Sequence, residues 1–224
     1  MEENYNLVRP EVVEYVKTEI FPRYKKLKGH GLQHIQNVIR RSLVFVRRIN
    51  EGEIAADTDG EIDYDMVFVI AAYHDLGREQ NDALHHLVSA GMLLLDKNLW
   101  GMFDKVQLRI MADAVMDHRA SNAFDPATIY GRIVSSADRD TDWQVIVKRA
   151  YAYNRGKYPE KTPDEALEVV REKLWIKFGA PDAYGAKKMF FDNPEYYEMI
   201  RKFHEITKES SRFREAVEGL IELV

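Results

Sequence analysis

An apolar segment in the first third of the chain ends in a histidine followed by an aspartate. Residues Met66 to Ile70 are all apolar, and the sequence continues Ala-Ala-Tyr-His74-Asp75-Leu-Gly77. Such a run is typical of a fully buried helix, and a glycine two residues after the pair is a common helix stop. A buried imidazole and a buried carboxylate are costly unless they are paired or bound to a metal. The pair therefore needs partners from elsewhere in the chain.

Most of the remaining chain repeats a helical pattern in which apolar residues recur every three or four positions. The clearest example runs from Leu32 to Ile49. No segment combines strand length, alternating polarity and flanking turns. We therefore expect an all-α helical bundle, with 224 residues forming one domain. Local signals predict N-caps at Asp63, Asp104 and Thr162. Helices are also expected to start at Asn81 or Asp82 and at Asp125-Pro126. The first helix should end at Pro22, and the last should run from Ser211 to Leu223.

The chain contains no cysteine. Disulfides, thiolate metal sites and thiol nucleophiles are therefore excluded. Any metal must be bound by His, Asp, Glu, carbonyl oxygens or water, which favours Mn, Mg, Fe, Co, Ni or catalytic Zn.

The charge of the chain restricts its partners and its location. A net charge of −5 argues against general nucleic-acid binding. No apolar run is long enough for a membrane helix, and the polar N-terminal residues do not resemble a signal peptide, so we expect a cytoplasmic protein without a membrane partner. The stretch from Pro22 to Asn50 carries eight Lys or Arg and no acid. It is interpreted either as a solvated helix face or as a positive rim that attracts an anionic substrate.

Further histidines and an aspartate interrupt or end the other helical segments. Six of the seven histidines lie between positions 30 and 118, and Asp138 closes the next apolar segment. Helices in a bundle build metal sites by projecting ligands inward from several facing elements. The residues that can face a common interior in this way are His34, His74, Asp75, His85, His118 and Asp138.

Three of these segments resemble the HD domain of metal-dependent phosphohydrolases. The resemblance lies in Gly-Leu-Gln-His34-Ile-Gln-Asn-Val, in Ala-Ala-Tyr-His74-Asp75-Leu-Gly-Arg and in Ser-Ala-Asp138-Arg, and it covers about residues 25 to 150. It implies an HD-domain bundle with additional C-terminal helices over residues 151–224. Arg78-Glu79 stands where the ppGpp hydrolases carry Glu-Asp, and the Gly-Tyr-Pro extension of the cyclic-di-GMP branch is missing. A stand-alone HD hydrolase is the nearest resemblance.

The resemblance implies a divalent metal held by His34, His74, Asp75 and Asp138. It also implies that His74 and Asp75 are catalytic, with a metal-activated water attacking a phosphate ester. The enzyme would be a phosphatase, nucleotidase or phosphodiesterase acting on a nucleotide or another small phosphorylated metabolite. His85 and His118 are candidates for a second metal or a phosphate contact, so one or two ions per chain are expected. His86, one step round the helix from His85, should face away.

Several alternatives stay open from the sequence. Arg78, Arg119 and Arg139 each follow a motif closely and are candidates for binding the substrate phosphate, although each could equally be a surface residue. The chain could instead be a non-catalytic module that binds metal or nucleotide as a sensor, or a di-iron oxygenase that uses the same six ligands. Substrate, metal identity and homo-oligomeric state are not fixed by the sequence.

Overall fold

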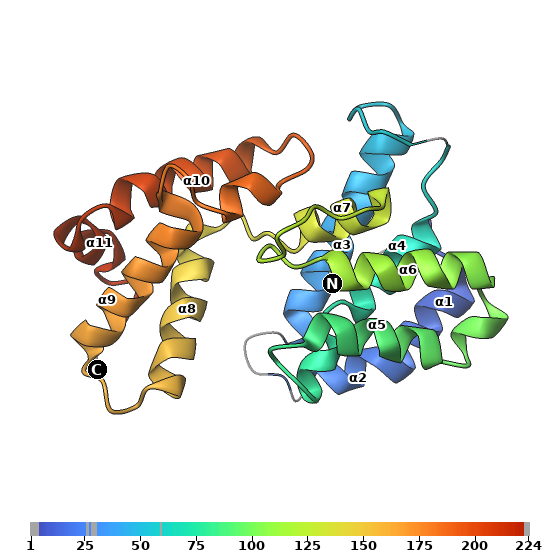
Figure 1. Cartoon of the computed structure of the whole chain (residues 1–224), viewed down its shortest axis with the longest axis horizontal. Helices are drawn as coiled ribbons and strands as arrows, with labels where there is room; N and C mark the ends of the chain where they lie inside the picture. The colour runs from blue at the N-terminus through green and yellow to red at the C-terminus, as the bar shows by residue number, and fades with distance from the viewer. Residues whose placement is uncertain (1–4, 26, 28–30, 59, 222–224) are drawn as a thin grey trace. The chain divides into compact units, whose positions relative to one another are not determined.

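The computed structural model describes residues 5–25, 27, 31–58 and 60–221, and these ranges contain helices and no strand. The prediction of an all-α protein is confirmed. The chain divides into two compact units, residues 1–138 and residues 139–224 (Figure 1). The expectation of one domain stays a prediction.

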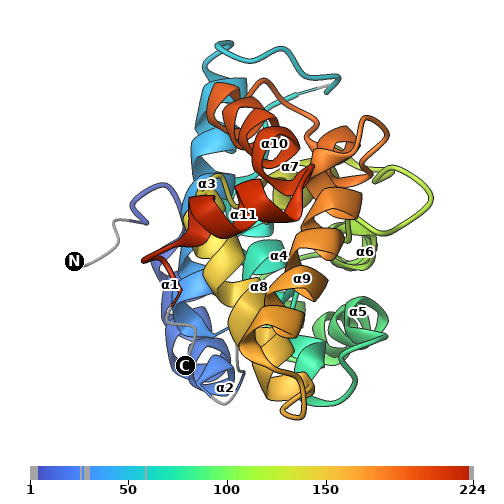
Figure 2. The ribbon, with the colours of Figure 1, turned by 90° about the vertical axis from the view of Figure 1, so that its left-hand side faces the viewer.

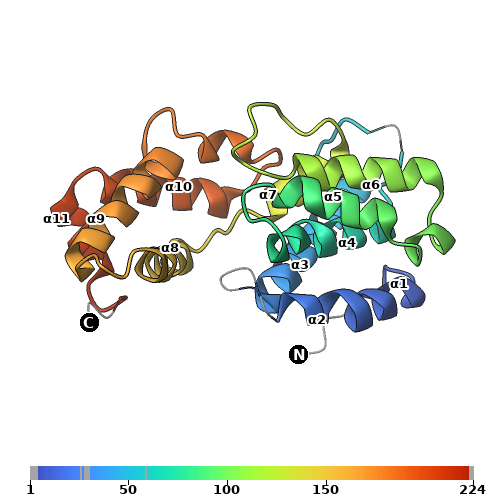
Figure 3. The ribbon, with the colours of Figure 1, turned by 60° about the horizontal axis from the view of Figure 1, so that its bottom comes forward.

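The first unit is built around one buried helix, α4 (Tyr64–Tyr73). All of its residues after Tyr64 are buried, and α3, α6 and α7 pack against it. Asp63 caps α4 by accepting hydrogen bonds from the backbone N–H groups of Asp65 and Met66, as predicted. Helix α5 lies alongside α6 (Figure 3). The other helices of this unit are α1 (Pro10–Tyr15), α2 (Phe21–Tyr24), α3 (Leu32–Asn50), α5 (His85–Leu95), α6 (Lys105–Asp117) and α7 (Ile129–Ala137).

The N-terminal helical segment does not stop at Pro22, so that prediction was wrong. Helix α1 continues through a π-helical turn, Val16–Ile20, into α2. Pro22 lies in the first turn of α2, where a missing backbone N–H is tolerated. The wider turn directly before it restarts the hydrogen-bond pattern, because the Phe21 N–H bonds to the Val16 carbonyl oxygen.

Among the other predicted helix starts in this unit, one is confirmed and two differ by a few residues. Asp104 forms a capping box with Gln107 at the start of α6, and this cap is confirmed. Helix α5 begins at His85 rather than near Asn81 or Asp82, and the side chain of Asn81 instead accepts a hydrogen bond from the Leu84 N–H. The N-cap of α7 is Thr128, three residues after Asp125.

The second unit has a core of its own. Its helices α8 (Trp143–Lys157) and α9 (Pro163–Leu174) pack side by side (Figure 2). Thr162 is the N-cap of α9, as predicted, and it forms a capping box with Glu165. A π-helical turn, Trp175–Gly179, follows that helix. The unit is completed by α10 (Pro194–Thr207) and α11 (Ser210–Val217); α11 ends earlier than predicted, and residues 222–224 lie outside the described ranges. No helix in the described part of the chain is long and apolar enough to cross a membrane.

Candidate metal centre

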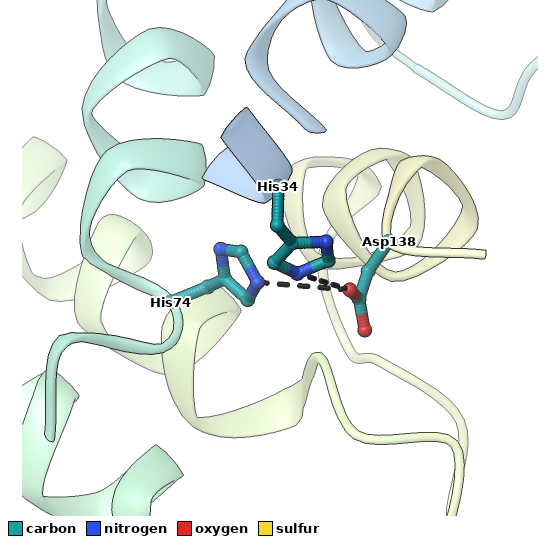
Figure 4. A group of neighbouring side chains, drawn as sticks. All are labelled: His34, His74 and Asp138. Atoms are coloured by element: carbon teal, nitrogen blue, oxygen red, sulfur yellow. Dashed lines mark ion pairs between the residues drawn. The ribbon is translucent and has the colours of Figure 1, made fainter. Parts of the chain in front are cut away.

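Three helix ends of the first unit bring histidine and aspartate side chains together. His34 lies in the first turn of α3, His74 is the C-cap of α4, and Asp138 is the C-cap of α7. Figure 4 shows the two imidazoles pointing toward the Asp138 carboxylate. Oδ1 of Asp138 lies 3.2 Å from Nε2 of His34 and 3.7 Å from Nε2 of His74. These three residues form one of the two described groups whose ligand atoms are close enough to share a metal ion.

Asp75 lies between two sets of imidazoles. Its Oδ2 is 3.5 Å from Nε2 of His74 and 3.7 Å from Nε2 of His34. Its Oδ1 is 3.2 Å from Nε2 of His85 and 3.8 Å from Nε2 of His118. The carboxylate therefore has one oxygen facing each set. The residues of this arrangement would offer ligand atoms to a divalent ion on either side of Asp75.

Backbone geometry explains how two consecutive residues reach one centre. His74 keeps helical dihedrals, with φ −52° and ψ −37°, whereas Asp75 has φ −107° and ψ 1°. The latter values lie in the bridge region, which is common in active sites. A 3₁₀ turn, Leu76–Glu79, follows. The chain thus leaves the helix at Asp75, and this change of direction lets the neighbouring side chains converge.

Backbone carbonyls fix the orientation of three of the imidazoles. Nδ1 of His74 lies 2.8 Å from the Ala71 carbonyl oxygen, Nδ1 of His85 lies 2.7 Å from that of Asp82, and Nδ1 of His118 lies 2.6 Å from that of Val115. Since a carbonyl oxygen only accepts, each Nδ1 is the donor. In the neutral form of each ring, Nε2 then presents its lone pair to the centre, as is usual for histidines that bind a metal.

Two buried nitrogens of the centre make no ordinary hydrogen bond. Nε2 of His74 and Nε2 of His85 are buried and make no hydrogen bond within the described ranges. Nearby, the Asp75 carboxylate is almost fully buried, and Asp138 is the second acid of the cluster. Buried polar atoms are normally satisfied, and two neighbouring carboxylates repel each other unless a cation lies between them. The donor set of imidazole nitrogens and carboxylate oxygens therefore fits a divalent ion.

The electrostatics of the imidazoles agree with this fit. Burial alone would lower the pKa of His74, but the charges of Asp75 and Asp138 raise it above its usual value. The cluster thus favours a positive charge at its centre. Burial, with repulsion from His74, lowers the pKa of His118 to about 3, and burial also lowers the pKa of His85. His85 and His118 are therefore neutral near pH 7, which is the form that binds metals.

Close packing after Asp75 brings His85 into position. A Cβ atom on Gly77 would lie 2.4 Å from the His85 carbonyl oxygen and 2.7 Å from the Ser89 backbone nitrogen. The Gly77 N–H donates a 2.8 Å hydrogen bond to Oγ of Ser89, which is fully buried. The 3₁₀ turn after Asp75 therefore contacts the first turn of α5 directly, and His85 lies in that turn.

The candidate phosphate-binding arginines contact their own chain. Nε of Arg78 donates to Oδ1 of Asp75 at 2.8 Å, and the same guanidinium bonds to Asp82. Arg119 donates to the Ala83 carbonyl oxygen at 3.0 Å and lies 3.3 Å from Nδ1 of His86. Arg139 is the first residue of the second unit, and its side chain is buried. Their role in binding phosphate stays a prediction.

His86 and His204 make contacts outside the candidate metal centre. His86 contacts Arg119 through Nδ1 rather than Asp75, consistent with the orientation expected from its place on the helix. His204, in the second unit, hydrogen-bonds to the Gly179 carbonyl oxygen at 2.6 Å and stacks on Trp175. His30 lies outside the described residues.

The sequence did not indicate the supporting contacts of the centre. The Nδ1 acceptors are backbone carbonyls of Ala71, Asp82 and Val115, which no side-chain pattern can mark. The contact from Arg78 to Asp75 had a partial signal, because an arginine three residues after an aspartate is within reach in a helical turn. No protein-family model, curated protein or solved structure matches this chain.

Proposed function

We propose that the first unit holds a divalent metal and hydrolyses a phosphate ester of a nucleotide or another small phosphorylated metabolite. The observation that carries the proposal is the convergence of His34, His74, Asp75 and Asp138 from three helix ends. The residue types and their order agree with the ligand set that the resemblance to the HD domain implies. The ion would be Mn, Mg, Fe, Co, Ni or Zn.

A divalent ion bound there would acidify a water molecule and polarise a phosphoryl oxygen. The protein itself supplies orientation and a dry environment. The imidazole of His74 is fixed by its bond to the Ala71 carbonyl oxygen, and Asp75 is fixed by Arg78. Both ligands are almost completely buried, so their charges and dipoles act in a medium of low dielectric constant.

The arginines near the centre offer a way to bind the substrate phosphate. Arg78 pairs on its outer side with Asp82, whose side chain is 66% exposed. An exposed ion pair contributes little, about 0–1 kcal/mol, so a phosphate can displace Asp82 at small cost. Arg47 and Arg48 are less suitable, because they lie about 20 Å along α3 from His34. This supports the interpretation of that part of the basic stretch as a solvated face.

A metal and substrate screen tests the proposal. The metal content of the purified full chain is measured first, and hydrolysis of phosphomonoesters, nucleotides and phosphodiesters is then assayed with each candidate ion. Asp75→Ala should lose both bound metal and phosphate release, whereas Asp57→Ala, in the exposed loop after α3, should keep both. A folded Asp75→Ala protein that retained metal and activity would refute the proposal. Nucleotide binding without turnover under every ion would favour the sensor alternative.

A di-iron oxygenase is a second candidate, because it would use the same six residues. His85 and His118 face one oxygen of Asp75 while His34 and His74 face the other, so both sets of imidazoles have a carboxylate oxygen beside them. Iron content after aerobic purification and oxygen uptake with candidate substrates distinguish this activity from hydrolysis. Two irons per chain with oxygen consumption and no phosphate release would support the oxygenase.

A further inference from the structure

Arg78 places a positive charge on one side of the Asp75 carboxylate. Its Nε donates to Oδ1 of Asp75 at 2.8 Å, and its side chain is only 19% exposed. The same Oδ1 atom lies 3.2 Å from Nε2 of His85 and 3.8 Å from Nε2 of His118. The guanidinium therefore contacts the oxygen that a second ion, bound by His85 and His118, would have to share.

The other oxygen of Asp75 lies on the side of a second carboxylate, that of Asp138. Oδ2 of Asp75 faces His34 and His74, and both of these imidazoles lie within 3.7 Å of the Asp138 carboxylate. A cation on this side has two carboxylates nearby. The carboxylate oxygen that faces His85 and His118, Oδ1 of Asp75, is already bonded to an arginine. Since like charges repel strongly when they are shielded from water, the two positions are electrostatically unequal.

We propose that Arg78 makes the two halves of the centre bind divalent ions with unequal affinity. The half formed by His34, His74, Asp138 and Oδ2 of Asp75 takes the first ion. The half formed by His85, His118 and Oδ1 of Asp75 takes a second ion only weakly, because Arg78 neutralises the carboxylate there. This inference rests on the proposed metal centre and goes beyond it, since it assigns an order of filling and the residue that sets it.

Arg78 could also act in the opposite direction, as a clamp that holds the second half together. It links Asp75 to Asp82, and the Asp82 carbonyl oxygen anchors Nδ1 of His85. The clamp passes through a largely exposed Asp82 side chain and is therefore weak. Packing of Gly77 against His85 and Ser89 holds the start of α5 without it. The charge effect should accordingly outweigh the clamp.

Two substitutions of Arg78 separate these effects. Arg78→Gln removes the positive charge and keeps a group able to donate a hydrogen bond to Asp75. Arg78→Lys keeps the charge but loses the planar guanidinium that donates to both Asp75 and Asp82. The full chain and both variants are titrated with Mn²⁺ by equilibrium dialysis, and bound ions are counted at each free concentration. Electron paramagnetic resonance then distinguishes isolated Mn²⁺ ions from coupled pairs. Circular dichroism melts verify that each variant is folded.

The wild-type protein should bind one Mn²⁺ tightly and a second at least about tenfold more weakly. Arg78→Gln should strengthen the second binding step by about tenfold or more and give coupled pairs, while Arg78→Lys should resemble the wild type. His85→Ala added to Arg78→Gln should remove the second step and retain the first. Two equal steps in the wild type, or a second step that Arg78→Gln leaves unchanged or weakens, would overturn the inference while leaving the metal centre intact. A wild-type chain that bound no Mn²⁺, Co²⁺ or Zn²⁺ would refute the metal centre itself.

Discussion

Gly77 and His85 meet through their backbones, so that a Cβ atom at position 77 would lie 2.4 Å from the His85 carbonyl oxygen. The same atom would lie 2.8 Å from Cβ of Val88. This contact couples the turn that carries Asp75 to the helix that carries His85. Any side chain at position 77 must push α5 away from that turn.

Gly77→Ala should therefore destabilise the protein, by about 1–3 kcal/mol as for an overpacked core. Urea denaturation measures the free energy of unfolding. The matched control is Gly91→Ala within α5, where an added Cβ meets no described atom outside its own helix within 4 Å. That change should stabilise the helix by roughly 0.5–1 kcal/mol. Equal effects of the two substitutions would contradict the close packing inferred at Gly77.

Ser89→Ala tests the same junction by removing a hydrogen bond instead of adding an atom. The buried Ser89 hydroxyl accepts from the Gly77 N–H at 2.8 Å. Alanine leaves this donor unsatisfied, so the free energy of unfolding should fall by about 1–3 kcal/mol. Ser121→Ala, at an exposed turn position, should change it by less than about 0.5 kcal/mol. A Ser89→Ala protein as stable as the wild type would show that this hydrogen bond makes no net contribution.

The parts of the fold that depend on local chemistry were predictable from the sequence. Asp63 and Asp104 cap the helices that they were expected to cap, because an N-cap needs only one side chain and the N–H groups two or three residues later. Pro22 was misjudged, since its place in a helix depends on the π-helical turn before it. That turn has no signature in residue type.

The candidate site was likewise predictable from the sequence only in part. The sequence indicated which residues end helices and could face one interior, and the structure brings His34, His74, Asp75, His85, His118 and Asp138 together. It could not indicate that the two oxygens of Asp75 face different imidazoles. That follows from the backbone change at Asp75 and from the packing at Gly77, both of which are tertiary features.

Asp96 should make the protein sensitive to acid. Burial alone would raise the pKa of Asp96, but hydrogen bonds from the hydroxyls of Tyr15 and Tyr73 lower it below its ordinary value. The unfolded state then binds more protons than the folded state in mild acid. The contribution of Asp96 to stability is therefore present above its ordinary pKa, near 4, and is lost as the pH falls through the lower folded value.

Asp96→Asn should accordingly reduce the free energy of unfolding at pH 7 by about 1 kcal/mol, the net contribution of a typical hydrogen bond. The difference from the wild type should shrink as the pH approaches 3. Urea denaturation at a series of pH values measures both effects. Asp57→Asn, which removes a charge from an exposed loop, should show neither. A deficit for Asp96→Asn that stayed constant down to pH 3 would rule out this linkage.

His85 and His86 are neighbours with different surroundings, and they provide a matched pair of substitutions. Nε2 of His85 lies 3.2 Å from Oδ1 of Asp75, whereas Nδ1 of His86 contacts Arg119. His85→Ala should weaken binding of the second divalent ion by on the order of 10- to 100-fold. Removing a residue that only hydrogen-bonds to a metal ligand already weakens metal binding by that much. His86→Ala should leave the same binding step within about twofold, as expected for a substitution outside the centre. Equilibrium dialysis against Mn²⁺ measures both, and equal losses in the two variants would mean that His85 has no special place in the centre.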